Sequence, residues 1–447
     1  MAFKAPPGTY DLLPEQAYAF NSIRQIAFDL FERYGYQPIE TPTFEHLEVF
    51  THGIGDATDV VGKEMYLALS QRGLSAVLAG DVPPRTSEML ALRPEQTAGV
   101  ARALVQHNLL PPGAATVKFV YAGAMFRHER PQKGRYREFR QIGAECLGAA
   151  EPSADAEVIV MLMRFFSALG IPRERMRLLL NSMGDDVCRP AYRAQVRDYI
   201  LAHADVLCAD CVRRADTNPL RAFDCKSESC QAVMADAPRI TDVLCADCRG
   251  HYDAVLAYLD AAGIAYEEDP RLVRGLDYYT RTVFEVQAIQ GLGAQNALGG
   301  GGRYDRLIEV FGGKPTPGLG FAVGFERILL ALQALEEEKA AGGECEGGGA
   351  VFALPRVRIF LATVDDQARQ AAFELALDLR DAGIPVEMDH QGRSLKSQFR
   401  LADKIQAAFV GILGPDELAD KTIRLRDMAT REEALVALEN LVERLVP

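Results

Sequence analysis

The chain has 447 residues, 48% of them hydrophobic, and a formal net charge of −13 at pH 7. This length allows two or three domains with sizeable cores. The acidic balance argues against a protein that coats nucleic acid through its overall charge, but it leaves room for a local basic site. The sequence shows no signal-peptide pattern at its start and no uncharged apolar run of about eighteen residues. We therefore expect a cytoplasmic protein that does not span a membrane.

Helix and strand patterns divide the first three quarters of the chain into three regions. Residues 1–180 combine an amphipathic helix over 15–34 with strand-like runs. Residues 181–265 have a mainly helical pattern and contain most of the cysteines. Residues 266–335 return to strand-like runs with many glycines, so the first and third regions share a mixed pattern that the second interrupts.

The remaining residues separate into a linker and a compact domain. Residues 336–355 are glycine-rich and predict a flexible linker. Residues 356–447 alternate short apolar runs with helical periodicity, which predicts an α/β domain. The expected elements are strands over 357–363, 384–388, 407–413 and 422–428, and helices over 365–382, 394–403 and 431–445.

The motif LRPEQT (92–97) places a carboxylate on a rigid turn. Pro94 fixes the backbone and Glu95 follows directly. Such a carboxylate would suit a substrate ammonium group. Taken alone, Pro-Glu is also a common helix start, and that interpretation is favoured until other motifs support the first.

A basic hairpin is the densest signal in the sequence. Strand-like runs over 117–126 and 135–147 flank the polar turn RPQKG, which is typical of a hairpin with a longer loop. Guanidinium groups bind phosphate through paired hydrogen bonds and stay charged at any working pH. The basic or potentially basic residues of the hairpin are Arg127, His128, Arg130, Lys133, Arg135, Arg137 and Arg140.

Strand alternation assigns these side chains to two faces. It places Arg135, Arg137, Phe139 and Gln141 on one face and Arg140 on the other. An aromatic ring between arginines suits a stacked base. The competing interpretation is a solvent-exposed basic hairpin, to which composition alone gives equal weight.

The segment LVRGLDYYTRTVFEV (272–286) places an arginine in an apolar, β-prone run. Burial of an unpaired charge is costly, so Arg274 is expected to face a carboxylate or a bound anion. Tyr278 and Tyr279 add hydroxyl donors. An internal ion pair with Asp277 or another acid competes with the ligand interpretation.

The glycines of LGGGGRYD (298–305) permit positive φ angles and close backbone approach to a ligand. The run matches neither a dinucleotide-binding fingerprint nor a phosphate-binding loop with Gly-Lys-Ser/Thr. Taken alone, a tight hairpin explains it better.

The segment PGLGFAVGFERILLAL (317–332) predicts a short strand that runs directly into an amphipathic helix. Glu326 and Arg327 lie in the first helical turn. An arginine there opposes the helix dipole, which indicates a functional reason for it. Ligand phosphates near that helix terminus would supply one.

The nine cysteines are expected to be reduced, because a chain of this length does not need disulfides. Cys208-x-x-Cys211 and Cys245-x-x-Cys248 have the spacing of zinc ligands, with Cys188, Cys225 and Cys230 nearby. The alternatives are a structural zinc held by the two pairs, or reduced cysteines packed among helices without metal.

Together these segments resemble class II aminoacyl-tRNA synthetases, and specifically the histidyl-tRNA synthetase family, over nearly the whole chain. GYQPIETPTFE (35–45) is similar to the first class motif, with Pro42 at the family's dimer interface. FRHE to GAE (126–145) is similar to the second and GLGFAVGFERI (318–328) to the third. LVRGLDYY and GGGRYD resemble the two histidine-specific signatures.

The resemblance implies an α+β fold. Residues 1–180 and 266–335 would form the catalytic domain, an antiparallel sheet flanked by helices. Residues 181–265 would be an inserted helical domain, and residues 356–447 an α/β anticodon-binding domain behind the 336–355 linker. The family is homodimeric. Residues 71–91 look longer than the family's usual connection.

The resemblance also implies a role for each matched position. Glu95, Thr97 and Gln141 would hold the α-amino group of histidine, while Glu145, Tyr279 and Tyr304 would enclose its imidazole. For ATP, Arg127 and Arg274 would act at the α-phosphate, Glu129 and Phe139 at adenine, and Arg135 and Arg327 at the γ-phosphate.

The implied reaction joins histidine to its tRNA. Histidine reacts with Mg·ATP to give histidyl-adenylate and pyrophosphate, and the histidyl group then moves to the 3′-terminal adenosine of the tRNA. Two alternatives share the fold: a non-catalytic paralogue that serves as regulatory subunit of ATP phosphoribosyltransferase, and a tRNA-binding sensor. The regulatory paralogue lacks an anticodon domain and has lost catalytic positions, whereas this sequence has both the domain and those positions.

Overall fold

The computed structural model describes residues 3–55, 58–80, 89–111, 113, 116–290, 296–341 and 357–446. The chain forms two compact units, Met1–Val351 and Phe352–Pro447. The first unit is built on an eight-stranded sheet with the order β1-β5-β6-β11-β10-β9-β7-β8. Its strands are β1 (Gln37–Pro38), β5 (Val117–Phe126), β6 (Glu138–Leu147), β7 (Met176–Ser182), β8 (Glu267–Glu268), β9 (Thr280–Ala288), β10 (Ala297–Arg303) and β11 (Gly318–Gly324).

The sheet is antiparallel except at its two edges, where β1 pairs with β5 and β8 with β7 in parallel. The expected hairpin is confirmed, because β5 and β6 pair antiparallel along their full lengths. Strands β6 and β10 both pair with β11, although about 150 residues separate β6 from β10 along the chain. The sheet therefore brings the hairpin beside the glycine-rich strand and the strand that precedes α11.

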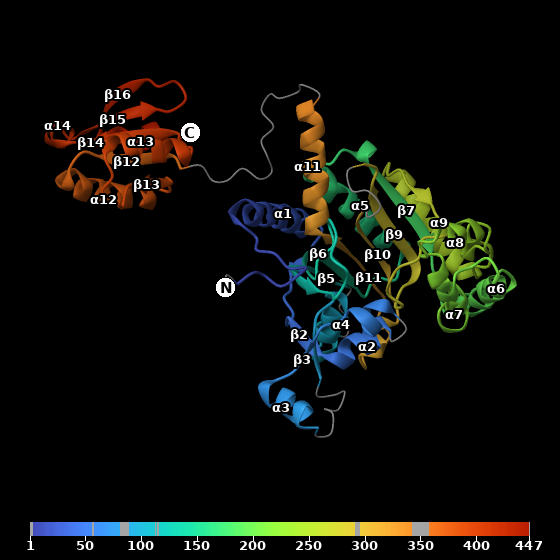
Figure 1. The fold of residues 1–447 in the computed structure, drawn as a ribbon. Coiled ribbons are helices and arrows are strands. Elements are labelled where there is room, and N and C mark those ends of the chain that lie inside the picture. The colour runs from blue at the N-terminus through green and yellow to red at the C-terminus, as the bar shows by residue number, and fades with distance from the viewer. Residues whose placement is uncertain are drawn as a thin grey trace. The chain divides into compact units, whose positions relative to one another are not determined.

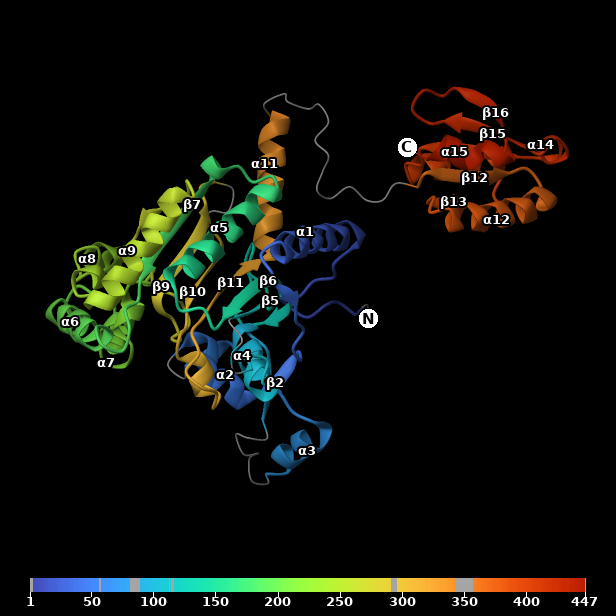
Figure 2. The same cartoon turned by 180° about the vertical axis from the view of Figure 1, so that it is seen from behind.

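One face of the sheet is covered by a row of helices, which Figures 1 and 2 show from opposite sides. The helix expected over 15–34 is confirmed as α1. Phe31 of that helix contacts Phe165 of α5 and Phe321 of β11 with ring centroids 5.5 and 5.6 Å apart. The row consists of α1 (Pro14–Glu32), α5 (Pro152–Ala168) and α9 (Ala246–Ala261).

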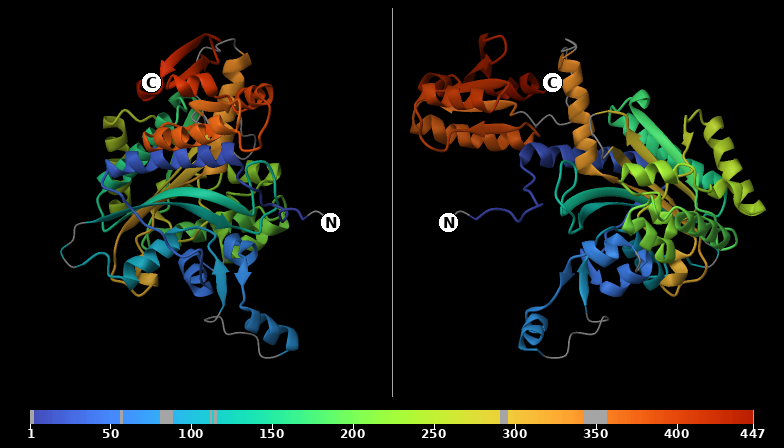
Figure 3. Two further views of the ribbon diagram at one scale, coloured as in Figure 1. Left: turned by 90° about the vertical axis from the view of Figure 1, so that its left-hand side faces the viewer. Right: turned by 45° about the vertical axis from the view of Figure 1, so that its right-hand side comes forward.

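The opposite face carries smaller elements, which lie below the sheet in the left panel of Figure 3. A three-stranded sheet with the order β2-β4-β3 lies at this side. The elements are β2 (Phe44–His46), α2 (Leu47–Ile54), β3 (Leu67–Ala68), α3 (Gln71–Ala79), β4 (Leu90–Leu92), α4 (Thr97–Gln106) and α10 (Leu307–Val310). Helix α3 falls in the stretch expected to be longer than in relatives, of which 81–88 lie outside the described residues.

The 181–265 segment is mainly helical, as its pattern predicts. Its helices share an apolar core that includes Val196, Ile200 and Met234. They are α6 (Arg189–Ala202), α7 (Ala209–Thr217) and α8 (Glu228–Met234), followed by α9.

Helix α11 (Phe325–Ala341) follows β11 directly, so the predicted strand-to-helix junction is confirmed. The helix also corrects the linker prediction, because its last turns occupy 336–341. Those residues include three glutamates, a lysine and two alanines, which are good helix formers. The rest of the predicted linker, 342–355, lies outside the described residues.

The second unit is a five-stranded sheet with the order β13-β12-β14-β15-β16. Ala368, Ala372 and Ala376 let helix α12 pack closely on one face of this sheet. Ala402 of α13 lies in the core on the other face. The elements are β12 (Ile359–Thr363), α12 (Asp366–Asp381), β13 (Val386–Met388), α13 (Leu395–Lys404), β14 (Phe409–Leu413), α14 (Pro415–Ala419), β15 (Thr422–Asp427), β16 (Glu433–Ala437) and α15 (Leu441–Leu445).

The helix predicted over 431–445 is wrong in its first half. Residues 433–437 form β16, which pairs antiparallel with β15 from Thr422↔Ala437 to Arg426↔Glu433. Only 441–445 are α-helical. The apolar spacing suits a helix, but the unpaired edge of β15 supplies backbone partners that local propensity does not register.

Candidate active site

A pocket of about 230 Å3 lies on the sheet face that carries α4. Its walls come from the start of α4, the β5–β6 hairpin, the loop before β9, strands β10 and β11, and the start of α11. The structure brings together all twelve residues that the resemblance assigns to substrates. They are Glu95, Thr97, Arg127, Glu129, Arg135, Phe139, Gln141, Glu145, Arg274, Tyr279, Tyr304 and Arg327.

Strand alternation and register place one end of the pocket. Phe139, Gln141 and Glu145 are spaced by even numbers on β6 and therefore face the same way. Gly320 of β11 pairs with Glu145. A Cβ at Gly320 would lie 1.9 Å from a carboxylate oxygen of Glu145, so a side chain there would displace that carboxylate. Glycine is needed here for close approach.

Glu145 lies at the bottom of this end and accepts three hydroxyl hydrogen bonds. Thr97 donates at 2.7 Å and Tyr121 at 3.1 Å, and Tyr304 donates to the other carboxylate oxygen. The residue is 1% exposed. Burial raises the pKa of Glu145 to about 8, even though the hydroxyl groups of Tyr304 and Thr97 oppose the shift. The result is a fixed polar slot walled by aromatic rings, since the ring centroid of Tyr278 lies 4.7 Å from that of Tyr279 and 5.6 Å from that of Tyr304.

Glu95 both opens α4 and lines the pocket. Its carboxylate accepts hydrogen bonds from the backbone N–H groups of Thr97 (2.7 Å) and Ala98 (2.9 Å). The two interpretations of the Pro-Glu motif are therefore compatible. Burial raises the pKa of Glu95, while the two backbone N–H groups act in the opposite direction. Nearby, the buried side-chain oxygen of Gln141 has no hydrogen-bond partner among the described residues, which leaves an acceptor for a ligand.

The other end of the pocket is cationic. Arg127 donates to the backbone carbonyl of Pro94 at 2.9 Å, and its guanidinium lies 5.4 Å from the centroid of the Phe139 ring. Arg135 forms an ion pair with Glu129. Arg327 from α11 donates to backbone carbonyls, among them Ala297 at 2.9 Å.

Arg327 forms no ion pair with a carboxylate among the described residues. Burial and the nearby charge of Arg135 lower the pKa of Arg327. Two guanidinium groups that repel each other inside a pocket favour an anionic ligand between them. Arg327, which opposes the dipole of α11, therefore lies where phosphate oxygens would offset the unfavourable interaction of its charge with that dipole.

Arg274 enters the pocket from the loop before β9 and pairs with Glu285 at 2.7 Å. The structure therefore shows the internal ion pair that competed with the ligand interpretation, formed with Glu285 and not with Asp277. The side chain of Arg274 is 21% exposed, so its remaining donors are accessible to a ligand. A Cβ at Gly300 would lie 2.7 Å from the guanidinium, so the glycine strand makes room for this arginine.

Two sequence predictions about this region are wrong. The glycines of 298–305 form strand β10 and not a tight hairpin, and none of them has a positive φ. The alternation expected for the hairpin also fails before Glu138, where β6 begins. Arg137 therefore leaves the pocket face and donates to the backbone carbonyl of Glu129 at 3.2 Å, although Arg135 does line the pocket.

Sequence reasoning missed Tyr121 as a wall of the pocket and Glu285 as the partner of Arg274, and it gave Tyr278 only as a hydroxyl donor. A signal for Tyr121 existed in the hairpin itself. Tyr121 pairs with Gly143 across β5 and β6, and a Cβ at Gly143 would lie 2.3 Å from the tyrosine ring. A glycine in a central strand often marks such a close approach.

The two C-x-x-C pairs do not form one site, so the predicted ligand set is wrong. Cys208 and Cys211 cluster with two other cysteines, and Cys245 and Cys248 belong to a second cluster. Cys208 and Cys211 lie at the start of α7, whereas Cys245 and Cys248 lie at the start of α9, and spacing along the chain could not reveal which cysteines meet.

An antiparallel sheet with arginines from three distant segments gathered over one face, beside a closed polar slot, is the architecture of a class II aminoacyl-tRNA synthetase. A family model for histidyl-tRNA synthetase matches residues 8–328, and one for an anticodon binding domain matches 357–446. The chain belongs to the histidyl-tRNA synthetase family.

Full-length relatives agree. The chain is 44% identical over 445 residues to a histidine–tRNA ligase of Anaeromyxobacter dehalogenans, with 100% of both sequences covered. It is 43% identical to that of Desulforamulus reducens, covering 98% of this chain and 97% of the relative. The apo histidyl-tRNA synthetase of S. aureus superimposes with a TM-score of 0.78 at 34% identity, covering 99% of this chain and 100% of that one. Among the described residues, no helix is long and apolar enough to cross a membrane.

Proposed function

We propose that the pocket activates L-histidine with Mg·ATP and then transfers the histidyl group to the 3′-terminal adenosine of the matching tRNA. One observation carries this proposal. Arg127, Arg274 and Arg327, which are far apart in the sequence, converge on one pocket beside the slot formed around Glu145. The retention of these arginines, together with a matched anticodon-binding domain, argues against a regulatory paralogue and against a sensor without catalysis.

The slot is suited to an imidazole. In the carboxylate form, Glu145 accepts an N–H group of the ring, and the hydroxyl of Tyr279 or Tyr304 lies nearby. Such a site rejects side chains without a ring N–H, because its own buried polar atoms would lose their partners. Thr97 donates to Glu145 and borders Glu95, so it couples the imidazole end of the substrate to its amino end.

The substrate ammonium group would lie between Glu95 and Gln141. Both offer oxygen atoms in the pocket, and that of Gln141 has no partner among the described residues. This places the histidine carboxylate toward the cationic end of the pocket, where the α-phosphate must lie for attack.

The arginines would hold the triphosphate. Arg127 and Arg274 bind the α-phosphate, Arg135 and Arg327 the γ-phosphate, while Phe139 and Glu129 contact adenine. The histidine carboxylate attacks the α-phosphorus in line, and pyrophosphate leaves. The fixed guanidinium groups offset the charge that develops in the transition state, so no protein nucleophile is required.

Magnesium arrives with ATP as part of the substrate. The cationic end contains two carboxylates: Glu129, which would contact adenine, and Glu285, whose oxygens are suitable ligands for a hard cation. Each is ion-paired to an arginine in the structure, so binding of Mg·ATP would exchange those pairs for phosphate contacts.

The division of labour along the chain follows the same proposal. Residues 1–180 and 266–335 form the catalytic domain and 181–265 the insertion, while 356–447 bind the anticodon of the tRNA. We further propose a cytoplasmic homodimer, with Pro42 at the interface between subunits.

The test is ATP–pyrophosphate exchange measured with each of the twenty amino acids. Histidine alone should support exchange above background, and the protein should then charge tRNA from a bacterial extract with labelled histidine. Exchange with another amino acid would refute the specificity. Binding of tRNA without any exchange would favour the sensor interpretation.

A further inference from the structure

The insertion gathers its cysteines into two separate groups. Of the eight cysteines among the described residues, all except Cys146 lie between 188 and 248. Within each group, one potential ligand atom from every residue lies within 4.8 Å of the others. The first group is Cys208, Cys211, Cys225 and Cys230, and the second is Asp185, Cys188, Cys245 and Cys248.

The first group has the dimensions of a tetrahedral thiolate site. Cys208 immediately precedes α7 and Cys211 lies in its first turn, while Cys225 and Cys230 come from the α8 region. The sulfur atoms of Cys208 and Cys225 are 3.8 Å apart. Zinc–sulfur bonds of about 2.3 Å in a tetrahedron require sulfur atoms about 3.8 Å apart, whereas a disulfide requires about 2.05 Å. The backbone N–H of Cys208 donates to the sulfur of Cys230 at 3.2 Å, as expected for a stabilised metal-bound thiolate.

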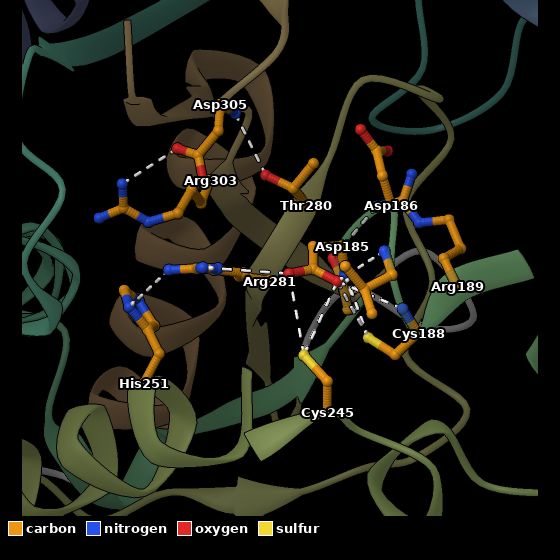
Figure 4. A network of polar contacts seen from close by, with 12 residues as sticks. Asp185, Asp186, Cys188, Arg189, Cys245, His251, Thr280, Arg281, Arg303 and Asp305 are labelled. Atoms are coloured by element: carbon orange, nitrogen blue, oxygen red, sulfur yellow. Dashed lines mark hydrogen bonds and ion pairs between the residues drawn. The ribbon is translucent and has the colours of Figure 1, made fainter. Parts of the chain in front are cut away.

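The second group repeats this arrangement at the junction with the catalytic sheet (Figure 4). Cys245 immediately precedes α9 and Cys248 lies in its first turn, and Cys188 immediately precedes α6. The fourth member is Asp185, whose carboxylate lies 3.4 Å from the sulfur of Cys188 and 3.9 Å from that of Cys245. The backbone N–H of Asp185 donates to the sulfur of Cys188 at 3.3 Å.

Packing of reduced thiols does not explain the two groups well. A buried free cysteine behaves as a small apolar side chain, and Cys211 and Cys230 do lie in the apolar core of the insertion. Apolar packing has no reason to direct four sulfur atoms to one point, or to repeat that convergence with a carboxylate as the fourth group. Small helical domains with limited cores commonly gain stability from a bound metal.

We propose that the insertion binds two structural zinc ions. The four thiolates of the first group hold one, and the three thiolates and the Asp185 carboxylate of the second hold the other. Sulfur-rich tetrahedral ligand sets favour zinc over the oxygen-seeking cations. The first site stabilises the core of the insertion, since its ligands connect α7 to α8.

The second site joins the insertion to the wall of the active-site pocket. The turn that follows β7 forms two backbone hydrogen bonds with Arg281. The N–H of Arg281 donates to the carbonyl of Gly184 (2.7 Å), and the N–H of Met183 donates to the carbonyl of Arg281 (2.6 Å). Arg189, next to Cys188, donates to the backbone carbonyl of Tyr279. A metal that fixes this turn therefore supports the backbone of a residue that lines the histidine slot.

Metal analysis of the full-length protein, purified without added zinc and washed with EDTA, tests the proposal. We expect two zinc ions per chain. Cys211→Ser and Cys188→Ser should each lower the zinc content to one ion per chain. The control variant Cys146→Ala removes a buried thiol that belongs to neither group, and it should retain two zinc ions. The zinc content of the wild-type protein is the primary measurement, so it stands even if a variant folds poorly.

Cobalt exchange and thiol titration supply independent readouts. Cobalt-loaded wild-type protein should show intense sulfur-to-cobalt charge-transfer absorption, and each serine variant should lose part of it. Metal-free protein with every thiol reactive, or cysteines joined in disulfides, would overturn both sites. One zinc that is lost in Cys211→Ser but unaffected by Cys188→Ser would support the first site and overturn the second. None of these results depends on histidine activation.

Discussion

Replacement of Arg274 by histidine separates binding of the amino acid from its activation. Arg274 lies at the cationic end of the pocket, beside Tyr279, and its free donors are available to the α-phosphate. Loss of one fixed donor to a developing charge costs about 2.7–4 kcal/mol, which corresponds to a fall in kcat of roughly 10²–10³-fold. We therefore expect ATP–pyrophosphate exchange to fall by that factor while the Kd for histidine changes by less than about threefold.

The substitution also leaves Glu285 without its partner. Breaking a fully buried ion pair costs about 3–5 kcal/mol, but the two side chains here are 21% and 18% exposed. We therefore expect a smaller loss of unfolding free energy, about 1–2 kcal/mol, which leaves the protein folded at assay temperature.

The assay combines exchange kinetics with equilibrium binding of histidine by calorimetry. Arg271→His is the matched control, because Arg271 is an exposed arginine nearby that pairs with Asp269 outside the pocket. It should retain wild-type exchange. Near-normal exchange in Arg274→His, with the variant folded, would show that this guanidinium does not assist attack on the α-phosphorus.

Three further predictions address the slot and the core. Gly320→Ala places a Cβ against the Glu145 carboxylate, and overpacking of about 1–3 kcal/mol should raise the KM for histidine by about tenfold. The control Gly62→Ala has open space around the new Cβ and should leave this KM unchanged. An unchanged KM in Gly320→Ala would contradict the close approach of Gly320 to Glu145. Because burial raises the pKa of Glu145 to about 8, its acceptor form grows as pH rises, so histidine affinity should increase from about pH 7 to about pH 8.5 and Glu145→Gln should flatten that profile. The side chains of Arg303 and Asp155 form an ion pair and are each 1% exposed. Arg303→Met leaves the Asp155 carboxylate without this partner and should lower the free energy of unfolding, measured by urea titration, by about 3–5 kcal/mol. A loss under about 1 kcal/mol would mean that another group compensates the carboxylate.

Several structural features could be predicted because they depend on local periodicity. The amphipathic pattern over 15–34 gives α1, and the two apolar runs around RPQKG give the β5–β6 hairpin. The glycine-spaced run before Phe325 gives β11 and α11 in immediate succession. Where a competing partner lay elsewhere in the chain, as for β16 at the edge of β15, local pattern was misleading.

Convergence in space is the fact on which the proposed function depends. Cations from the loop of the β5–β6 hairpin, the loop before β9 and α11 share a pocket because β6, β10 and β11 are neighbours in one sheet despite their separation in the chain. On the opposite face of the sheet, Phe31 of α1 packs against Phe165 of α5 and Phe321 of β11. No single motif contains that information, since it belongs to the packing of the whole sheet.

The amino-acid sequence is enough to list the chemical groups of the site: guanidinium groups in three motifs, a carboxylate after Pro94, and hydroxyls near Arg274. Which of these groups meet depends on the fold. In the folded protein Arg137 lies outside the pocket, whereas Tyr121 and Glu285 line it. The cysteines lie in two clusters. The physical reason is that periodicity fixes the face of an element, whereas partners across a sheet or between helices are set by long-range pairing and packing.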